Sequence, residues 1–107
     1  MADRPKEVEL RMRKYEIMAI IDPDLDERQV QPLIERHLKV ITDNGGTVDG
    51  TDYWGRRRMA YEINKKTDGI YVVITLTAEP ATVQELDRLM TIDETVVRTK
   101  VMRLDAK

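Results

Sequence analysis

An α+β fold with the element order βαββαβ is predicted for this chain by three observations. Four segments alternate apolar and polar residues with the period of two typical of strands: residues 15–21, 47–63, 70–78 and 96–104. Two segments between them, beginning near residues 26 and 80, repeat apolar residues at helical spacing. The length of 107 residues fits one domain with a modest core. Such a split pair of βαβ units closes most simply as a ferredoxin-like fold, a four-stranded antiparallel sheet in strand order 4-1-3-2 with both helices on one face.

The first strand should place Tyr15, Ile17, Ala19 and Ile21 on one face, and Asp22-Pro23-Asp24 should end it. A helix follows, with Asp26 as a plausible N-cap and Asn44-Gly45-Gly46 as its end. Its apolar positions are Val30, Leu33, Ile34, His37, Leu38 and Ile41. Pro32 removes a backbone donor early in this helix, so we expect a distorted start or a cap later than Asp26.

Residues 47–63 form the longest predicted strand, with Gly55 at an expected bulge or bend. Met59, Tyr61 and Ile63 alternate there with Arg58, Ala60 and Glu62. Residues 65–69 have the composition of a turn, so the third strand should begin at Ile70 and complete a hairpin.

The second helix is signalled by Pro80 and by Thr82 with Glu85, and Asp93-Glu94 should break it. The last strand, residues 96–104, follows it. From these patterns we expect four residues to be buried between sheet and helices: Leu38, Ile74, Leu86 and Val101.

Two helices can cover only one face of the sheet, so the other face should stay open. The outward positions Met18, Met59, Tyr61, Tyr71, Val73 and Met102 would make that face partly apolar. Singly, such residues are ordinary strand side chains; together they indicate a docking surface for another protein.

Enzymatic and metal-dependent functions are disfavoured by the residue types. The chain has no cysteine and no serine, and its only histidine, His37, lies among apolar helix positions as a partly buried structural residue would. The acidic residues around Asp22 lack the spacing of a calcium loop. We therefore expect no catalytic site, no metal, no cofactor and no small-molecule substrate.

Basic residues are segregated although the net charge is only −2. Arg13 and Lys14 precede the first strand, Arg56 to Arg58 with Lys65 and Lys66 mark the hairpin, and Arg98, Lys100 and Arg103 lie on the last strand. Because the first and last strands are expected to be neighbours, Arg13, Lys14, Arg98 and Lys100 should form one basic edge. Such an edge is either a solvated face or a binding site for RNA phosphates, which needs no base reading. Outward residues Glu16 and Met18 leave no aromatic platform for bases on the first strand.

The motif WGRRRMAYEINK, from Trp54 to Lys65, resembles the central motif of the bacterial small-subunit ribosomal protein S6 family. The segments MRKYEIMAIIDPDLDE and TVVRTKVMR are similar to the same family's first and last strands, so the resemblance covers residue 12 to about residue 104. It implies a non-enzymatic component of the small ribosomal subunit. Such a protein pairs with the subunit's eighteenth protein and binds the central domain of the subunit's ribosomal RNA.

The resemblance, together with the outward patch, implies two sets of site residues. Residues expected to contact the partner protein are Trp54, Arg57, Met59, Tyr61, Tyr71 and Val73. Residues expected to contact RNA are Arg13, Lys14, Lys65, Arg98, Lys100 and Arg103.

One alternative function remains, a ferredoxin-like regulatory domain that senses a small molecule or forms oligomers through the same open face. Residues 1–11 mix charges with a proline and are expected to be a flexible extension before a single domain at residues 12–107. No apolar run approaches the roughly 20 residues of a membrane span, and the start lacks the apolar region of a signal peptide, so we expect a cytoplasmic, ribosomal location without membrane contact.

Overall fold

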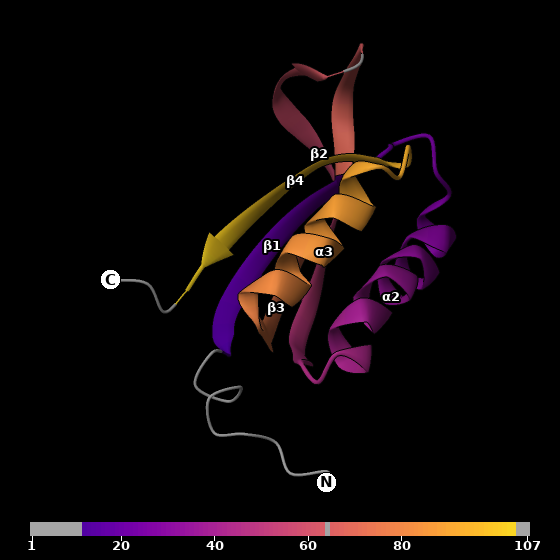
Figure 1. The fold of residues 1–107 in the computed structure, drawn as a ribbon. Coiled ribbons are helices and arrows are strands. Elements are labelled where there is room, and N and C mark those ends of the chain that lie inside the picture. The colour runs from indigo at the N-terminus through magenta and orange to yellow at the C-terminus, as the bar shows by residue number, and fades with distance from the viewer. Residues whose placement is uncertain (1–11, 64, 105–107) are drawn as a thin grey trace, which may run out of the picture.

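Four strands and two helices follow one another in the predicted order in the computed structural model, which describes residues 12–63 and 65–104. The strands are β1 (Arg13–Ile21), β2 (Thr47–Ile63), β3 (Lys66–Ala78) and β4 (Val96–Arg103), and the helices are α2 (Glu27–Asp43) and α3 (Pro80–Thr91). All neighbouring strands are antiparallel, in the order β2-β3-β1-β4. Both helices cover the same face of this sheet (Figure 1). The prediction of a ferredoxin-like α+β fold is confirmed.

The core lies between the sheet and the helices, because alternate strand residues point toward the helical layer. Ile17, Ile74 and Leu86 have no solvent exposure, and Leu38 is buried beside them, as predicted. Val101, the fourth expected core residue, is partly buried and packs against this cluster. The apolar strips of α2 and α3 therefore hold the helices on the sheet, each buried side chain contributing about 1.5–3 kcal/mol.

Helix α2 begins where the N-cap pattern predicted, but without the late start expected from Pro32. The Asp26 carboxylate accepts a hydrogen bond from the backbone N–H of Arg28, and Pro32 lies inside the helix. Of the two outcomes expected from Pro32, a distorted start or a cap later than Asp26, the later cap does not occur. Val30, Leu33 and Ile34 are buried on either side of the proline, so tertiary packing of this turn outweighs the missing backbone donor.

His37 connects α2 to the turn before β4. Its Nε2 atom lies 2.7 Å from Oδ2 of Asp93, and only 11% of its side chain is exposed. The other carboxylate oxygen of Asp93 accepts hydrogen bonds from the backbone N–H and the hydroxyl of Thr95. The single histidine is thus structural, as its place among apolar positions indicated.

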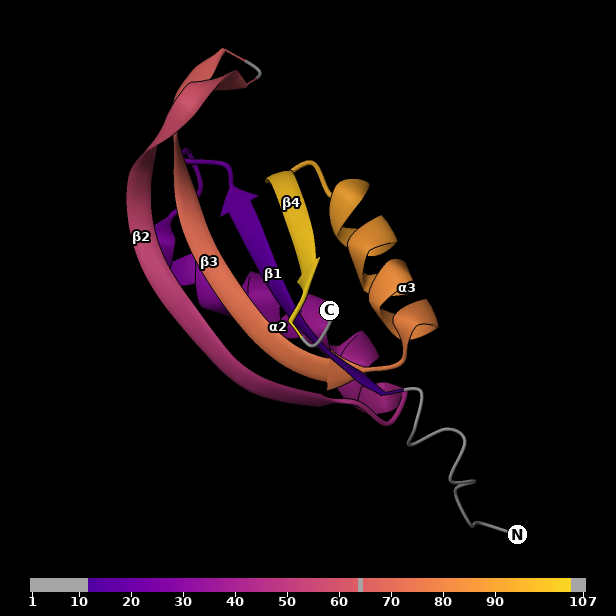
Figure 2. The same ribbon diagram turned by 90° about the vertical axis from the view of Figure 1, so that its left-hand side faces the viewer.

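The β2–β3 hairpin is longer than predicted. β3 begins at Lys66 instead of Ile70, because Gly69 and Asp68 continue the pairing with Arg57 and Arg58. The hairpin extends beyond the ends of β1 and β4 (Figure 2). We call this extension, residues 56–63 of β2 and 66–69 of β3, the hairpin arm.

Neither described helix is long and apolar enough to cross a membrane. The expected flexible extension, residues 1–11, lies outside the described residues.

Candidate protein and RNA interface

The face of the sheet opposite the helices is built from transverse rows of side chains, of which three span all four strands. The strand register places Lys100, Met18, Val73 and Asp52 in one row and Arg98, Ile20, Tyr71 and Gly55 in the next. The third row contains Met102, Glu16, Thr75 and Gly50. Apolar side chains therefore occupy the middle strands of the first two rows, with cations at one end.

Aromatic residues gather where β2 and β3 pair. The rings of Trp54 and Tyr71 stack with centroids 6.4 Å apart and planes only 8° from parallel. The guanidinium of Arg57 lies 5.5 Å from the centre of the Trp54 ring, within cation–π range. Trp54 is still 42% exposed, on an edge strand. This arrangement gives the edge a wide, rigid apolar surface of the kind enriched at protein interfaces.

A bulge in β2 at Gly55 interrupts the regular strand next to Trp54. The register between β2 and β3 shifts between Tyr53 and Gly55, and Gly55 adopts φ +83°. A side chain at that φ is strained, so glycine suits this position. The predicted bend at Gly55 is confirmed.

The hairpin arm is anchored to the loop that follows β1 by one residue at its base and one near its turn. Arg56 donates a hydrogen bond of 2.9 Å to the carbonyl oxygen of Pro23, and Lys66 forms ion pairs with Asp24 and, at 3.4 Å, with Asp22. The hydrogen bond to Asp24 raises the pKa of Lys66, and the charge of Asp22 adds to this shift. Two basic residues of the hairpin thus hold its position instead of facing a ligand.

A second bulge turns the tip of the arm over the open face. Between the pairs Arg58–Asp68 and Ile63–Lys66, four residues of β2 stand opposite the single residue Thr67. The bulge disturbs the predicted alternation, because Ala60 lines the same surface as Met59, Tyr61 and Ile63.

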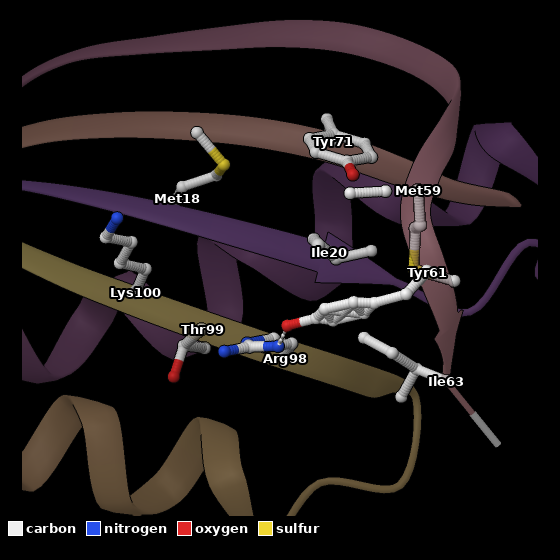
Figure 3. Close-up of a pocket in the computed structure, with 10 residues that line it drawn as sticks. Met18, Ile20, Met59, Tyr61, Ile63, Tyr71, Arg98, Thr99 and Lys100 are labelled. Carbon is white, nitrogen blue, oxygen red and sulfur yellow. Dashed lines mark hydrogen bonds between the residues drawn. The ribbon is translucent and has the colours of Figure 1, made fainter. Parts of the chain in front are cut away.

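Beneath the arm lies a depression of about 320 Å³ (Figure 3). Ile20 and Met59 are only 8% and 7% exposed, although both belong to the face without helices. Tyr61 reaches from β2 toward β4, where Arg98 donates a hydrogen bond to its hydroxyl and lies 5.5 Å from the ring centre. Met18, Tyr71 and Lys100 complete the walls.

The structure gathers the residues predicted for the partner protein. Trp54 contacts both Tyr71 and Arg57, while Met59, Tyr61 and Tyr71 line the depression. Val73 lies on the same face, paired with Met18 and Asp52. Ile20 also lines the depression but was not predicted to do so. The signal was present in the sequence, because Ile20 is an apolar residue at an outward position of the first strand.

The residues predicted for RNA fall into three separate places. Arg103 pairs with Tyr15, beside Arg13 and Lys14, at one end of β1. Arg98 pairs with Ile20, six residues from Lys14, which corresponds to roughly 20 Å along a strand. Lys65 lies in the hairpin turn, at φ +65°. The expected single edge of Arg13, Lys14, Arg98 and Lys100 is therefore divided into two clusters: Arg13 and Lys14 lie at the start of β1, whereas Lys100 and Arg98 lie opposite Met18 and Ile20.

The chemistry of this face suits binding more than reaction. Within residues 12–63 and 65–104, no group of three or more His, Cys, Asp or Glu residues could hold a metal ion. The depression is lined by thioether, aliphatic, aromatic and cationic groups, without a carboxylate to act as a general base. The face offers apolar contact and positive charge.

Comparisons with known proteins agree on one family. The family model described as Ribosomal protein S6 matches residues 14–103. The chain is 66% identical over 92 residues to the small ribosomal subunit protein bS6 of Cutibacterium acnes, covering 86% of this chain and 96% of that protein. It is 62% identical over 94 residues to the bS6 protein of Mycolicibacterium paratuberculosis, covering 88% and 98%.

Solved structures share the fold. The crystal structure of 30S ribosomal protein S6 from Thermotoga maritima matches with a TM-score of 0.79 and 33% identity, over 86% of this chain and 87% of that one. The C-terminal domain of the MgtC protein from Mycobacterium tuberculosis matches with a TM-score of 0.60 at 15% identity, over 87% and 88% of the two chains. The second likeness concerns the fold alone, which unrelated functions can share.

Proposed function

The chain belongs to the ribosomal protein S6 family, and from this premise we propose that it binds the central domain of small-subunit ribosomal RNA as half of a heterodimer with the eighteenth small-subunit ribosomal protein. Membership in the family establishes the general role of the chain. It is a protein of the small ribosomal subunit, works in the cytoplasm as part of the ribosome, and is not an enzyme.

The observation that supports the partner protein is the aromatic surface around the stacked pair Trp54 and Tyr71. Large aromatic side chains beside an arginine are the residues that most often dominate protein–protein affinity. Tyr71 belongs to the face that no helix covers, and Trp54 is exposed on the edge strand, so a second protein can reach both without disturbing the core.

RNA binding is supported by three basic residues, Arg13, Lys14 and Arg103, at the end of the sheet where β1 begins and β4 ends. Lysine and arginine bind RNA through its phosphates and release counterions, without reading the bases. Lys65 adds a cation at the hairpin turn, whereas Arg98 and Lys100 lie on the rim of the depression, within reach of either macromolecule.

The partner is tested by measuring the affinity of the purified chain for the recombinant eighteenth protein. Tyr71→Ala should weaken binding by about 2 kcal/mol, roughly thirtyfold, because it removes the centre of the stacked surface. Tyr71 is only half-buried, so circular dichroism should show a folded variant. Ile92→Ala is the control, at an exposed apolar position that follows α3, away from the open face. Equal affinity of wild type and the Tyr71 variant would reject this surface as the docking site.

RNA binding is tested by titrating the assembled heterodimer with central-domain RNA at three salt concentrations. Replacing Arg13, Lys14 and Arg103 by Ala should reduce the slope of log K against log salt by about 0.7–0.9 for each lost phosphate contact. The matched control replaces three basic residues of α2 (Arg28, Arg36 and Lys39) on the helical side of the molecule. An unchanged slope in the first variant would place the RNA site elsewhere.

A further inference from the structure

The depression beneath the hairpin arm combines an apolar floor with two cations on one side. Ile20, Met18 and Met59 supply aliphatic and thioether surface, and Arg98 and Lys100 project from the neighbouring strand β4 (Figure 3). The volume of about 320 Å³ lies at the lower end of the range of about 300–1,000 Å³ for ligand pockets. It is large enough for a side chain or two, but not for a folded element.

Among residues 12–63 and 65–104, no carboxylate lines the depression. On the open face, Glu16 lies one row farther along β1, and Asp52 lies across the sheet on β2, where it accepts a hydrogen bond from the Trp54 indole. Glu62, in the hairpin arm, is exposed and does not line the depression. Some other cations do have acidic partners: Lys66 pairs with Asp22 and Asp24, and Arg88 pairs with Glu85. The charge at the rim is therefore unbalanced in a chain whose formal net charge is −2.

Arg98 is held in position by a neutral group and forms no ion pair among the described residues. Among the described residues, its hydrogen bond goes to the neutral hydroxyl of Tyr61. A guanidinium has five N–H donors in a planar fork that matches a carboxylate, so this contact leaves donors available. The contact also orients the side chain in advance, which lowers the entropy lost when a ligand binds.

From these features, and resting on the proposed protein-binding function of this face, we infer that the depression receives a segment of the partner protein in which an apolar side chain lies beside a carboxylate. The apolar side chain fills the space over Ile20, Met18 and Met59, and the carboxylate pairs with Arg98 and Lys100. The carboxylate belongs to an aspartate, a glutamate or the end of the partner chain.

A protein segment fits this site better than RNA does. RNA phosphates would satisfy Arg98 and Lys100, but they would leave the apolar floor without a partner. Bases need free aromatic faces for stacking, whereas the Tyr61 ring already carries Arg98 at 5.5 Å and the Tyr71 ring stacks with Trp54 at 6.4 Å. Methionine-rich surfaces adapt their shape readily to apolar side chains of other proteins.

The inference is tested with the full-length chain and the recombinant eighteenth small-subunit protein as the probe. Arg98→Ala should weaken their association by about tenfold or more, and Lys100→Ala by about threefold, because each removes a cation that faces the carboxylate. Lys39→Ala removes the same charge from an exposed position of α2 and should leave the affinity unchanged. Replacing each acidic side chain of the partner by its amide, and amidating its C-terminus, should identify one carboxylate whose effect disappears in Arg98→Ala.

Tyr61→Phe separates a direct role of Arg98 from an effect on the hairpin arm. This variant keeps the ring and removes only the hydroxyl that accepts the hydrogen bond of Arg98. If Arg98 pairs with a partner carboxylate, Tyr61→Phe should weaken binding clearly less than Arg98→Ala does, because it keeps the cation and loosens only its orientation. If Tyr61→Phe weakens binding as much as Arg98→Ala does, Arg98 acts only by holding the arm, and the inference is wrong.

Two further outcomes would overturn the inference while preserving the proposed heterodimer. In one, Tyr71→Ala weakens the association but Arg98→Ala has no larger effect than Lys39→Ala. In the other, Arg98→Ala leaves the protein complex intact and lowers the affinity of the heterodimer for RNA, which would make Arg98 a phosphate contact. Absence of any association between the wild-type proteins would instead reject the proposed function itself.

Discussion

The two faces of the sheet are made by alternate residues of the same strands, yet they differ completely in composition. Toward the helices, β3 presents Ile70, Val72, Ile74, Leu76 and Ala78, all buried. Toward the other side it presents Tyr71, Val73, Thr75 and Thr77, all half-buried. The covered face is aliphatic because its residues only have to exclude water and pack closely. The open face mixes aromatic, apolar and charged groups because no helix covers it and its residues stay in contact with water.

The largest expected difference between the faces comes from truncating a residue of the covered side. Leu86→Ala should lower the free energy of unfolding by about 2–5 kcal/mol, because Leu86 is completely buried and its loss leaves a cavity. Met102→Ala on the open face should change it by less than about 0.5 kcal/mol. Urea denaturation of both variants gives the comparison, and similar losses at the two positions would mean that both faces contribute to one core.

Adjacent residues of β3 allow a sharper comparison with no change in size. Val72→Thr should destabilise the fold by about 1–3 kcal/mol, because it buries a hydroxyl at a position with no solvent exposure. Val73→Thr places the same hydroxyl on the open face and should cost less than about 0.5 kcal/mol. Thermal or chemical denaturation distinguishes the two, and a reversed order would show that the strand faces have been assigned the wrong way round.

Packing beneath the hairpin arm is the part of the open face that should behave like the core. A Cβ atom at Gly69 would lie 2.3 Å from Cγ2 of Ile20, whereas a Cβ atom at Gly50 would meet nothing within 4 Å. Gly69→Ala should therefore cost about 1–3 kcal/mol through overpacking. Gly50→Ala, also in the hairpin, should be neutral or slightly stabilising. Equal stabilities in denaturation would indicate that Ile20 yields easily and that the arm does not pack tightly.

The smallest expected effect concerns the contact between α2 and the turn before β4. Burial of Asp93 acts to raise its pKa, but hydrogen bonds from Thr95 and His37 outweigh burial and lower the pKa below its usual value. The stability that the ionised carboxylate provides is therefore fully present above the unfolded pKa of about 3.9 and is lost as the pH falls through the lower folded pKa. Asp93→Asn should cost about 1–2 kcal/mol at pH 7, and its difference from wild type should shrink below about pH 4.

The neighbouring exposed residue provides the control for that experiment. Glu94→Gln should change the free energy of unfolding by less than about 0.5 kcal/mol at either pH. Denaturation of both variants between pH 7 and pH 3 measures the effect. A constant difference between wild type and Asp93→Asn across this range would show that the carboxylate is not stabilised by its charge.

The sequence alone determined the features that depend on neighbouring residues. Alternation identified which residues of β1 and β3 face the helices, and the apolar repeats located both helices. The cap at Asp26 and the bend at Gly55 were also visible, because a capping carboxylate and a glycine with positive φ are local requirements. The outward aromatic residues already indicated a docking surface.

Tertiary structure decided the features that depend on residues far apart in the chain. Lys66 belongs to a strand and not to a turn, a position that its ion pairs with Asp22 and Asp24 support, and Pro32 stays inside α2 because both sides of that turn are buried. The bulge before Ile63 carries Tyr61 to Arg98, 37 residues away, and so forms the depression. The register of β4 against β1 divides the basic residues into two clusters. The pattern of the sequence assigns these cations to their strands. Only the pairing of the strands determines which cations lie side by side, because a shift in register changes the neighbours of every residue.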